Sequence, residues 1–204
     1  MNTISHVVIA NKINRDIENI LGISMNRYSF VYGSVRPDLR RGKFDTTHYK
    51  EEAKDYVYKM IEKVFEDYEE NWDSREFYVR LGEVIHFITD FFTYPHNKKY
   101  YEGARKDHHV YEFRQVMILF NRKKIKELKG LDASVPLLET LPEIFNYIDR
   151  LHVEYLASGP SEMIDCIFAY KVCNVLTTSI LSLYMKKAAV IEATKDLALD
   201  YGTI

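Results

Sequence analysis

The feature that most constrains this chain is a set of polar residues within the mainly apolar stretch 81–112. His86 and Asp90 are four residues apart, and so are His108 and Glu112. On an α-helix, residues i and i+4 lie on the same face, so each pair can direct an imidazole nitrogen and a carboxylate oxygen to one point. The neighbours of His86 and Asp90 are apolar, and buried polar groups need partners. The two pairs therefore predict metal ligands on largely buried helices.

Further histidines extend this pattern. Of the seven histidines in the chain, His6, His48 and His96 also lie where a metal cluster could use them, which leaves His109 and His152. A single histidine on an apolar face, such as His6, is more often a hydrogen-bonded core residue. Histidines combined with Asp and Glu, without thiolates, are more typical of catalytic zinc than of structural zinc. Taken together, the residues favour a site for more than one metal ion.

The rest of the chain has the apolar periodicity of helices and almost no strand-like alternation. A length of 204 residues and a hydrophobic content of 47% allow one domain with a substantial core. The pattern therefore predicts a single-domain, all-α, multi-helix bundle over residues 1–204. Helices are expected over residues 4–20, 49–71, 75–94, 108–122, 142–157 and 161–199.

Three local expectations concern the site. Residues 22–48 contain several glycines and no sustained period, so they should form an ordered loop with at most a short helix, and Asp38 should be a turn residue. Pro95 should end or bend its helix just before His96. The helix over 108–122 is expected to bury one face, made by Phe113, Val116, Met117 and Phe120.

Composition excludes some classes of protein. A net charge of −2 and a pI near 6.4 argue against a protein that neutralises a polyanion, so no stable nucleic-acid partner is expected. The apolar run 164–185 is interrupted by Asp165 and Lys171, which favours a core helix over a transmembrane segment. Cys166 and Cys173 are expected to be small core residues on that helix. The first twelve residues lack a basic region before an apolar run, so a cytoplasmic location is expected.

The order of the candidate ligands resembles that of the bacterial zinc-dependent phospholipases C, whose site is related to that of the fungal single-strand nucleases. The resemblance spans residues 6–112 and is carried by His6, Pro37-Asp38, His48, His86, Asp90, His96, His108 and Glu112. It implies a helical catalytic domain and a zinc-dependent phosphodiester hydrolase. It also implies that Asp38 is the general base or the group that orients the attacking water.

The same resemblance implies how the ligands are shared. One zinc would be held by His48, His86 and Asp90, and a second by His96, His108 and Glu112. Asp90 would bridge to a third zinc bound also by His6 and by the N-terminal amine and carbonyl. Members of the family typically bind this third zinc through an N-terminal tryptophan, whereas this chain begins with Met1 and carries its sole tryptophan at position 72. Two zinc sites are therefore expected, and the third stays open.

The expected substrate is a small phosphodiester or a phospholipid, which would be cleaved to an alcohol and a phosphomonoester. One alternative is a non-catalytic helical protein with structural zinc sites. Another is a nuclease that uses the same metal cluster and stacks bases on tyrosines. Candidate tyrosines for such stacking are Tyr32, Tyr49, Tyr100 and Tyr101. Three arginines near Asp38 could contact phosphate or simply be exposed, namely Arg36, Arg40 and Arg41. The sequence does not predict an oligomeric state.

Overall fold

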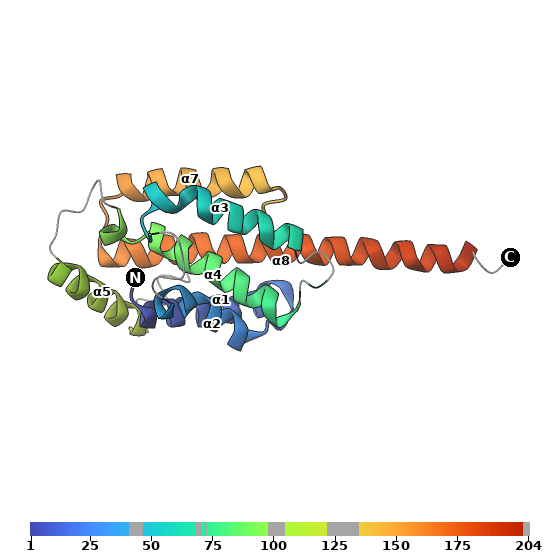
Figure 1. The fold of residues 1–204 in the computed structure, drawn as a ribbon, viewed down its shortest axis with the longest axis horizontal. Helices are drawn as coiled ribbons and strands as arrows, with labels where there is room; N and C mark the ends of the chain where they lie inside the picture. Colours follow the sequence, from blue (N-terminus) through green and yellow to red (C-terminus); the bar gives the residue numbers. More distant parts are fainter. Residues whose placement is uncertain (41–46, 68–70, 72, 98–104, 122–134, 202–204) are drawn as a thin grey trace.

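The computed structural model describes the chain except for residues 41–46, 68–70, 72, 98–104, 122–134 and 202–204 (Figure 1). For residues 105–106 and 192–201 it describes the backbone alone. The described elements are α1 (Thr3–Leu21), α2 (Arg27–Leu39), α3 (Lys50–Asp67), α4 (Arg75–Phe91), the short 3₁₀ helix η1 (Tyr94–His96), α5 (Arg105–Phe120), α7 (Leu141–Ala157) and α8 (Glu162–Tyr201). These ranges contain no strand, which confirms the all-α fold class. The single-domain organisation stays a prediction.

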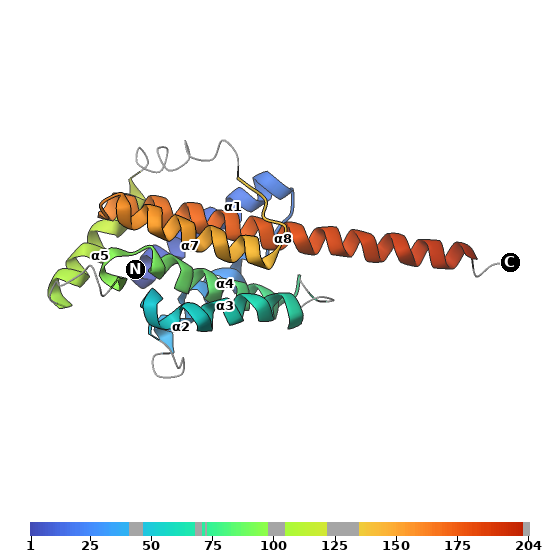
Figure 2. The same cartoon turned by 90° about the horizontal axis from the view of Figure 1, so that it is seen from above.

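Helix α4 is the central helix of the bundle. It contacts α1, α2, α3 and α8, and Figures 1 and 2 show it between these neighbours. Ser74 caps its N-terminus by accepting a hydrogen bond from the backbone amide of Phe77 at 3.1 Å. Every residue from 81 to 91 is buried. His86 and Asp90 therefore lie inside the protein, on a helix whose buried residues are mostly apolar.

Helix α2 corrects the expectation of a loop over residues 22–48, because residues 27–39 are helical. A Cβ atom added to Gly33 would lie 2.1 Å from the carbonyl oxygen of Val79, so α2 and α4 pack backbone against backbone. Such a contact face contains few large apolar side chains, and for this reason it leaves no clear period in the sequence. Its consequence is that Asp38 lies on the last turn of a helix held tightly against α4.

Helix α4 ends at Phe91, and the chain then turns through η1, which contains Pro95. The prediction that the helix would stop before His96 is confirmed, with the end three residues earlier than expected. The turn brings the Nδ1 atom of His96 to 3.7 Å from the Oδ2 atom of Asp90. The turn after Phe91 thus allows His96 and Asp90 to face each other.

Helix α5 does not bury the face that its sequence predicted. Val116 is buried, but the other three residues of the predicted face are exposed. The helix packs against α1 and α8 through a different face, which includes Glu112, Gln115 and Leu119. Because both faces carry apolar residues, the period of the sequence could not decide which one faces the core. The exposed residues are Phe113, Met117 and Phe120.

Helix α8 is 40 residues long, and its C-terminal part extends beyond the rest of the bundle (Figures 1 and 2). Its segment Glu162–Ile191 is long and apolar enough to cross a membrane by length and composition, yet 72% of its most apolar window is buried inside the protein. Asp165 on this helix accepts hydrogen bonds from the Tyr155 hydroxyl and the Gln115 amide, both at 2.8 Å. Cys166 and Cys173 are buried and form no disulfide.

Candidate metal centre

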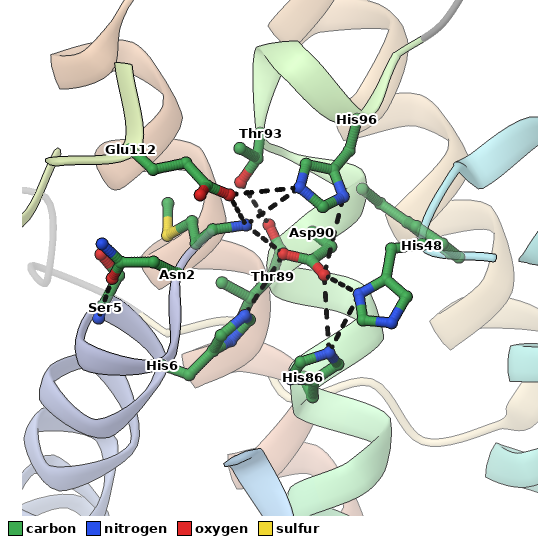
Figure 3. Close-up of polar contacts among 12 residues, drawn as sticks. Asn2, Ser5, His6, His48, His86, Thr89, Asp90, Thr93, His96 and Glu112 are labelled. Atoms are coloured by element: carbon green, nitrogen blue, oxygen red, sulfur yellow. Dashed lines mark hydrogen bonds and ion pairs between the residues drawn. The ribbon is translucent and has the colours of Figure 1, made fainter. Parts of the chain in front are cut away.

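One buried carboxylate, that of Asp90, lies at the centre of the candidate site (Figure 3). Its Oδ2 atom is 2.6 Å from the Nδ1 atom of His48 and 3.5 Å from the Nε2 atom of His86. Its Oδ1 atom is 3.3 Å from the Nε2 atom of His6. Helix α1, helix α4 and the segment before α3 thus place three imidazoles around one aspartate.

A second carboxylate, that of Glu112 on α5, faces the first. Its Oε1 atom is 3.1 Å from the Nε2 atom of His108 and 3.4 Å from the Nε2 atom of His96. His96 also approaches Asp90 through its other ring nitrogen. The two i,i+4 pairs identified in the sequence are therefore joined into one cluster by His96.

The ligand atoms fall into three groups, each close enough to hold a metal ion. The groups are His6, Asp38 and His86; His48, Asp90 and His96; and His96, His108 and Glu112. The last group is the set expected for the second zinc. The set expected for the first zinc, with His86 beside His48 and Asp90, is also compatible, because the Nε2 atom of His86 is 3.2 Å from the Nδ1 atom of His48. The geometry therefore allows two ways of sharing His86.

Asp38 lies at the edge of this cluster and is partly buried. The hydroxyl of Thr3 donates a hydrogen bond to its Oδ2 atom at 2.9 Å. A carboxylate oxygen of Asp38 also lies within 4.8 Å of ring nitrogens of His6 and His86. Asp38 can therefore reach the ions either as a ligand or as a base beside them.

The N-terminal amino group lies inside the cluster. Met1 is buried, and its amine forms an ion pair with the Oδ1 atom of Asp90. The same nitrogen is 3.5 Å from the Oε1 atom of Glu112 and 3.4 Å from the Nε2 atom of His96. Asn2 caps α1 immediately afterwards, so the first helix presents the amine and His6 to the same point. Side-chain patterns carry no signal for an amine ligand, and only the family resemblance implied it.

The electrostatics prepare the cluster for a cation. Burial alone would raise the pKa of the Asp90 carboxyl, but the nearby His96, N-terminal amine and His6 hold it well below its ordinary value. Burial lowers the pKa values of His86 and His96 below the ordinary range. Around neutral pH the carboxylate is ionised and these imidazoles are neutral, which are the protonation states that metal binding requires.

The pKa of the N-terminal amine reflects the negative charge of the cluster. Burial lowers this pKa, but the negative charges of Asp90 and Glu112 raise it above its ordinary value. A positive charge beside Asp90 therefore satisfies the buried carboxylates. A metal ion bound at the same place would replace that charge, and the amine would have to lose a proton to become a ligand.

The residues behind the cluster hold it in place. The Nδ1 atom of His86 is 2.9 Å from the backbone carbonyl of Ser34 on α2, so Nδ1–H donates there and Nε2 is directed into the cluster. Three residues before His86, the fully buried Glu83 pairs with Arg36 of α2 and, at 3.1 Å, with Arg80. Sequence reasoning did not identify Glu83, because its partner Arg36 lies on another helix and far away in the chain.

One observation that does not depend on the predicted ligand sets indicates that the donor atoms suit zinc. The ring of His6 is buried, and neither of its nitrogens makes a hydrogen bond, although Nε2 is near Asp90. Buried polar atoms in proteins almost always have a partner, so an unsatisfied imidazole at the centre of such a cluster is the arrangement expected of a metal ligand. Nitrogen and carboxylate oxygen are ordinary ligands of zinc.

The other candidates lie outside the cluster. His109 is exposed, with Nδ1 3.9 Å from the Oε2 atom of Glu112, and His152 contacts Asn97 instead. The ring of Tyr49 lies 6.1 Å from that of His96. Arg36 pairs with Glu83 and not with the metal ligands. Arg41, Trp72, Tyr100 and Tyr101 fall outside the residues that the structure describes.

A helical bundle collects imidazoles and carboxylates from six separate segments into three candidate metal groups, none of which contains a thiolate, and such donors are typical of zinc-binding proteins. A family model described as zinc dependent phospholipase C matches residues 5–162. The chain belongs to this family of phosphodiester hydrolases, which confirms the resemblance drawn from the residues. Comparisons with curated proteins and with solved structures found no significant match.

Proposed function

We propose that the protein hydrolyses the phosphodiester bond of a phospholipid, or of a closely related small phosphodiester, to an alcohol and a phosphomonoester. Membership of the family supports zinc and a phospholipid substrate. The observation that carries the proposal for this chain is the place of Asp38 at the end of α2, where its carboxylate lies close to ring nitrogens of His6 and His86. Holding two metal ions does not require this carboxylate, whereas activation of water does.

In this proposal the residues that would hold the metal ions are those that the family resemblance implies, and one of these sets, His96, His108 and Glu112, is also a ligand group of the structure. His48, His86 and Asp90 hold one ion, and His96, His108 and Glu112 hold another. His6, Asp90 and the amine of Met1 are the ligands of a third. Zinc, when bound, supplies Lewis-acid activation of water and neutralises the charge of the phosphodiester.

The protein's own part in the reaction is to move a proton and to hold the groups still. Thr3 donates to the Oδ2 atom of Asp38, which orients the carboxylate and makes Oδ1 the acceptor for a proton from the attacking water. The carbonyl of Ser34 keeps His86 in one tautomer. Asp38 later returns the proton to the leaving alkoxide or to solvent.

The test compares the wild-type protein with Asp38→Asn, His86→Ala and the exposed control Asp55→Asn. Zinc content is measured after reconstitution, and hydrolysis is measured with a chromogenic phosphodiester and with short-chain phosphatidylcholine. Asp38→Asn should keep its zinc and lose about 100- to 10,000-fold in kcat, the range for a general base. His86→Ala should lose zinc and activity together, and Asp55→Asn should match the wild type.

The outcome that contradicts the proposal is a wild-type protein that binds at least two zinc ions and hydrolyses neither substrate. If zinc removal also unfolded that protein, the structural-zinc alternative would be supported. Loss of one zinc equivalent in Asp38→Asn would instead make Asp38 a ligand. Single-stranded DNA in the same assay tests the nuclease alternative, for which Tyr49 is a candidate stacking residue because its ring lies 6.1 Å from that of His96.

A further inference from the structure

Helix α5 carries a row of exposed apolar side chains. Phe113 is 61% exposed, Met117 59% and Phe120 62%, and Val110 is exposed as well. These residues are spaced at i, i+3, i+7 and i+10, so they form one continuous side of the helix, here called the α5 stripe. Burying such side chains is normally the main driving force for folding, yet the fold leaves this row in solvent.

The α5 stripe belongs to the helix that supplies two metal ligands. His108 and Glu112 lie on α5, and Phe113 directly follows Glu112. Because a helix with its side chains is about 10–12 Å across, any surface that contacts the stripe comes within about that distance of the ligands. A rigid element thus connects the apolar surface to the site.

Exposed apolar residues also follow site residues on two other helices. Ile4 on α1 follows Thr3, which hydrogen-bonds to Asp38, and Leu39 on α2 follows Asp38 itself. Figures 1 and 2 show α5 and the N-terminus together at the end of the bundle opposite the extension of α8. Three helices therefore place large apolar side chains next to the candidate active site.

The size of this surface argues against a second copy of the chain as its occupant. A large side chain exposes about 150–250 Å² when free, so the three stripe residues that are about three-fifths exposed, together with Val110 at 43%, present about 400 Å². A stable protein interface buries about 800 Å² on each partner. A patch of about 300–600 Å² next to a binding site is instead the size at which monomers carry functional apolar patches.

We propose that the α5 stripe, together with Ile4 and Leu39, is a docking surface for a phospholipid bilayer. The inference rests on the proposed function, because a phospholipid substrate is held in a bilayer. Apolar side chains that bind an interface enter about 5–10 Å into the boundary between headgroups and acyl chains. Docked in this way, α5 brings the phosphodiester layer of the bilayer to His108 and Glu112.

The test uses the full-length, zinc-loaded protein and vesicles of dioleoylphosphatidylcholine. The variant Phe113→Ser/Met117→Ser/Phe120→Ser is compared with a matched triple at exposed apolar positions elsewhere, Tyr28→Ser/Leu137→Ser/Val153→Ser. Vesicle binding is measured by flotation in an Asp38→Asn background, so that the lipid is not consumed. Zinc content and melting temperature show that both triples fold and load metal.

The stripe variant should bind vesicles at least about tenfold more weakly than the parent, and the control triple should bind like the parent. With Asp38 present, the ratio of vesicle hydrolysis to soluble-diester hydrolysis should fall by a similar factor. Equal vesicle binding by the stripe variant and the parent would overturn the inference. So would absence of vesicle binding by the wild type, or a dimer in sedimentation velocity that the stripe substitutions dissolve.

The two proposals fail differently. If the wild type did not hydrolyse the soluble diester, the proposed function would be wrong, and vesicle binding would be unaffected. Stripe-dependent binding by an inactive protein would therefore leave the surface assigned and the chemistry unassigned. A fully active protein whose vesicle binding does not depend on the stripe would support the proposed chemistry and contradict the proposed docking surface.

Discussion

At the scale of single residues, the site depends on side chains whose protonation is set by burial. Asp90 illustrates this best, because it is fully buried and takes part in contacts with the amine, His6, His48 and His86. A buried carboxylate without these partners would strongly destabilise the folded protein. The same principle applies at His152, which is buried away from the cluster and gives a testable dependence of stability on pH.

His152 should make the protein less stable as the pH falls. Burial, followed by the charge of Lys50, lowers its pKa from 6.5 to about 4. The side-chain amide of Asn97 donates to the carbonyl oxygens of Phe91 and Thr93, so its Oδ1 atom accepts from Nε2–H of a neutral His152. Below pH 6.5 the unfolded chain takes up a proton that the folded protein does not bind until about pH 4.

The stabilising contribution of neutral His152 is therefore present above pH 6.5 and is lost as the pH falls toward about 4. Its full size is about 3 kcal/mol, from 1.36 kcal/mol per pKa unit. We expect the free energy of unfolding, measured with urea, to fall more steeply between pH 6.5 and 4.5 in the wild type than in His152→Gln. Gln keeps a donor for Asn97 and has no charge to gain, so parallel slopes would contradict the assignment.

At the scale of elements, α2 and α4 act as one unit. Gly33 and Gly82 let the two backbones touch, and Glu83 binds Arg36 across the same contact. This packing carries Ser34 to His86 and leaves Asp38 at the rim of the site. The position of the proposed base is thus set by the packing of α2 on α4.

The two partners of Glu83 allow a matched comparison. Arg36→Gln would leave the fully buried carboxylate of Glu83 without the partner whose side chain is only 19% exposed, and should cost about 3–5 kcal/mol of stability. Arg80→Gln removes a partner that is 46% exposed and should cost about 1 kcal/mol or less. Urea unfolding measures both. Equal losses would show that the pair does not hold α2 against α4.

At the scale of the whole molecule, the cluster joins segments between Met1 and Glu112, while much of the core lies elsewhere. The cluster unites Met1 and Glu112, which are distant in sequence. The hydrophobic core continues through α3, α7 and α8 with residues such as Ile61, Ile148 and Tyr184, which are not part of the candidate site. Zinc should therefore stabilise a bundle that already folds without it.

Removal of zinc should lower the melting temperature without unfolding the bundle at 25 °C. Ligand binding to the folded state adds about 4 kcal/mol when free zinc is a thousandfold above its Kd. We expect a chelator to remove this stabilisation, while circular dichroism keeps its helical spectrum. Asp90→Asn should show a smaller chelator effect than Asp55→Asn. A complete loss of helix on chelation would instead support structural zinc.

Much of the fold and part of the site could be predicted because they are local in the sequence. The helices over Arg75–Phe91 and Leu141–Ala157 follow from apolar period, caps and prolines that act over a few residues. The pairs at i and i+4 on α4 and α5 follow from helix geometry alone. Their meaning as zinc ligands came from residue chemistry and from the resemblance to the family.

Only the tertiary structure decided which segments meet. It made residues 27–39 a helix packed on α4, brought the amine of Met1 to Asp90, paired Glu83 with Arg36, and turned Phe113 outward. Each of these results depends on contacts between residues far apart in the chain or on a choice between two apolar faces. Local pattern cannot encode such choices, because the energy of a contact exists only once packing has brought both partners together.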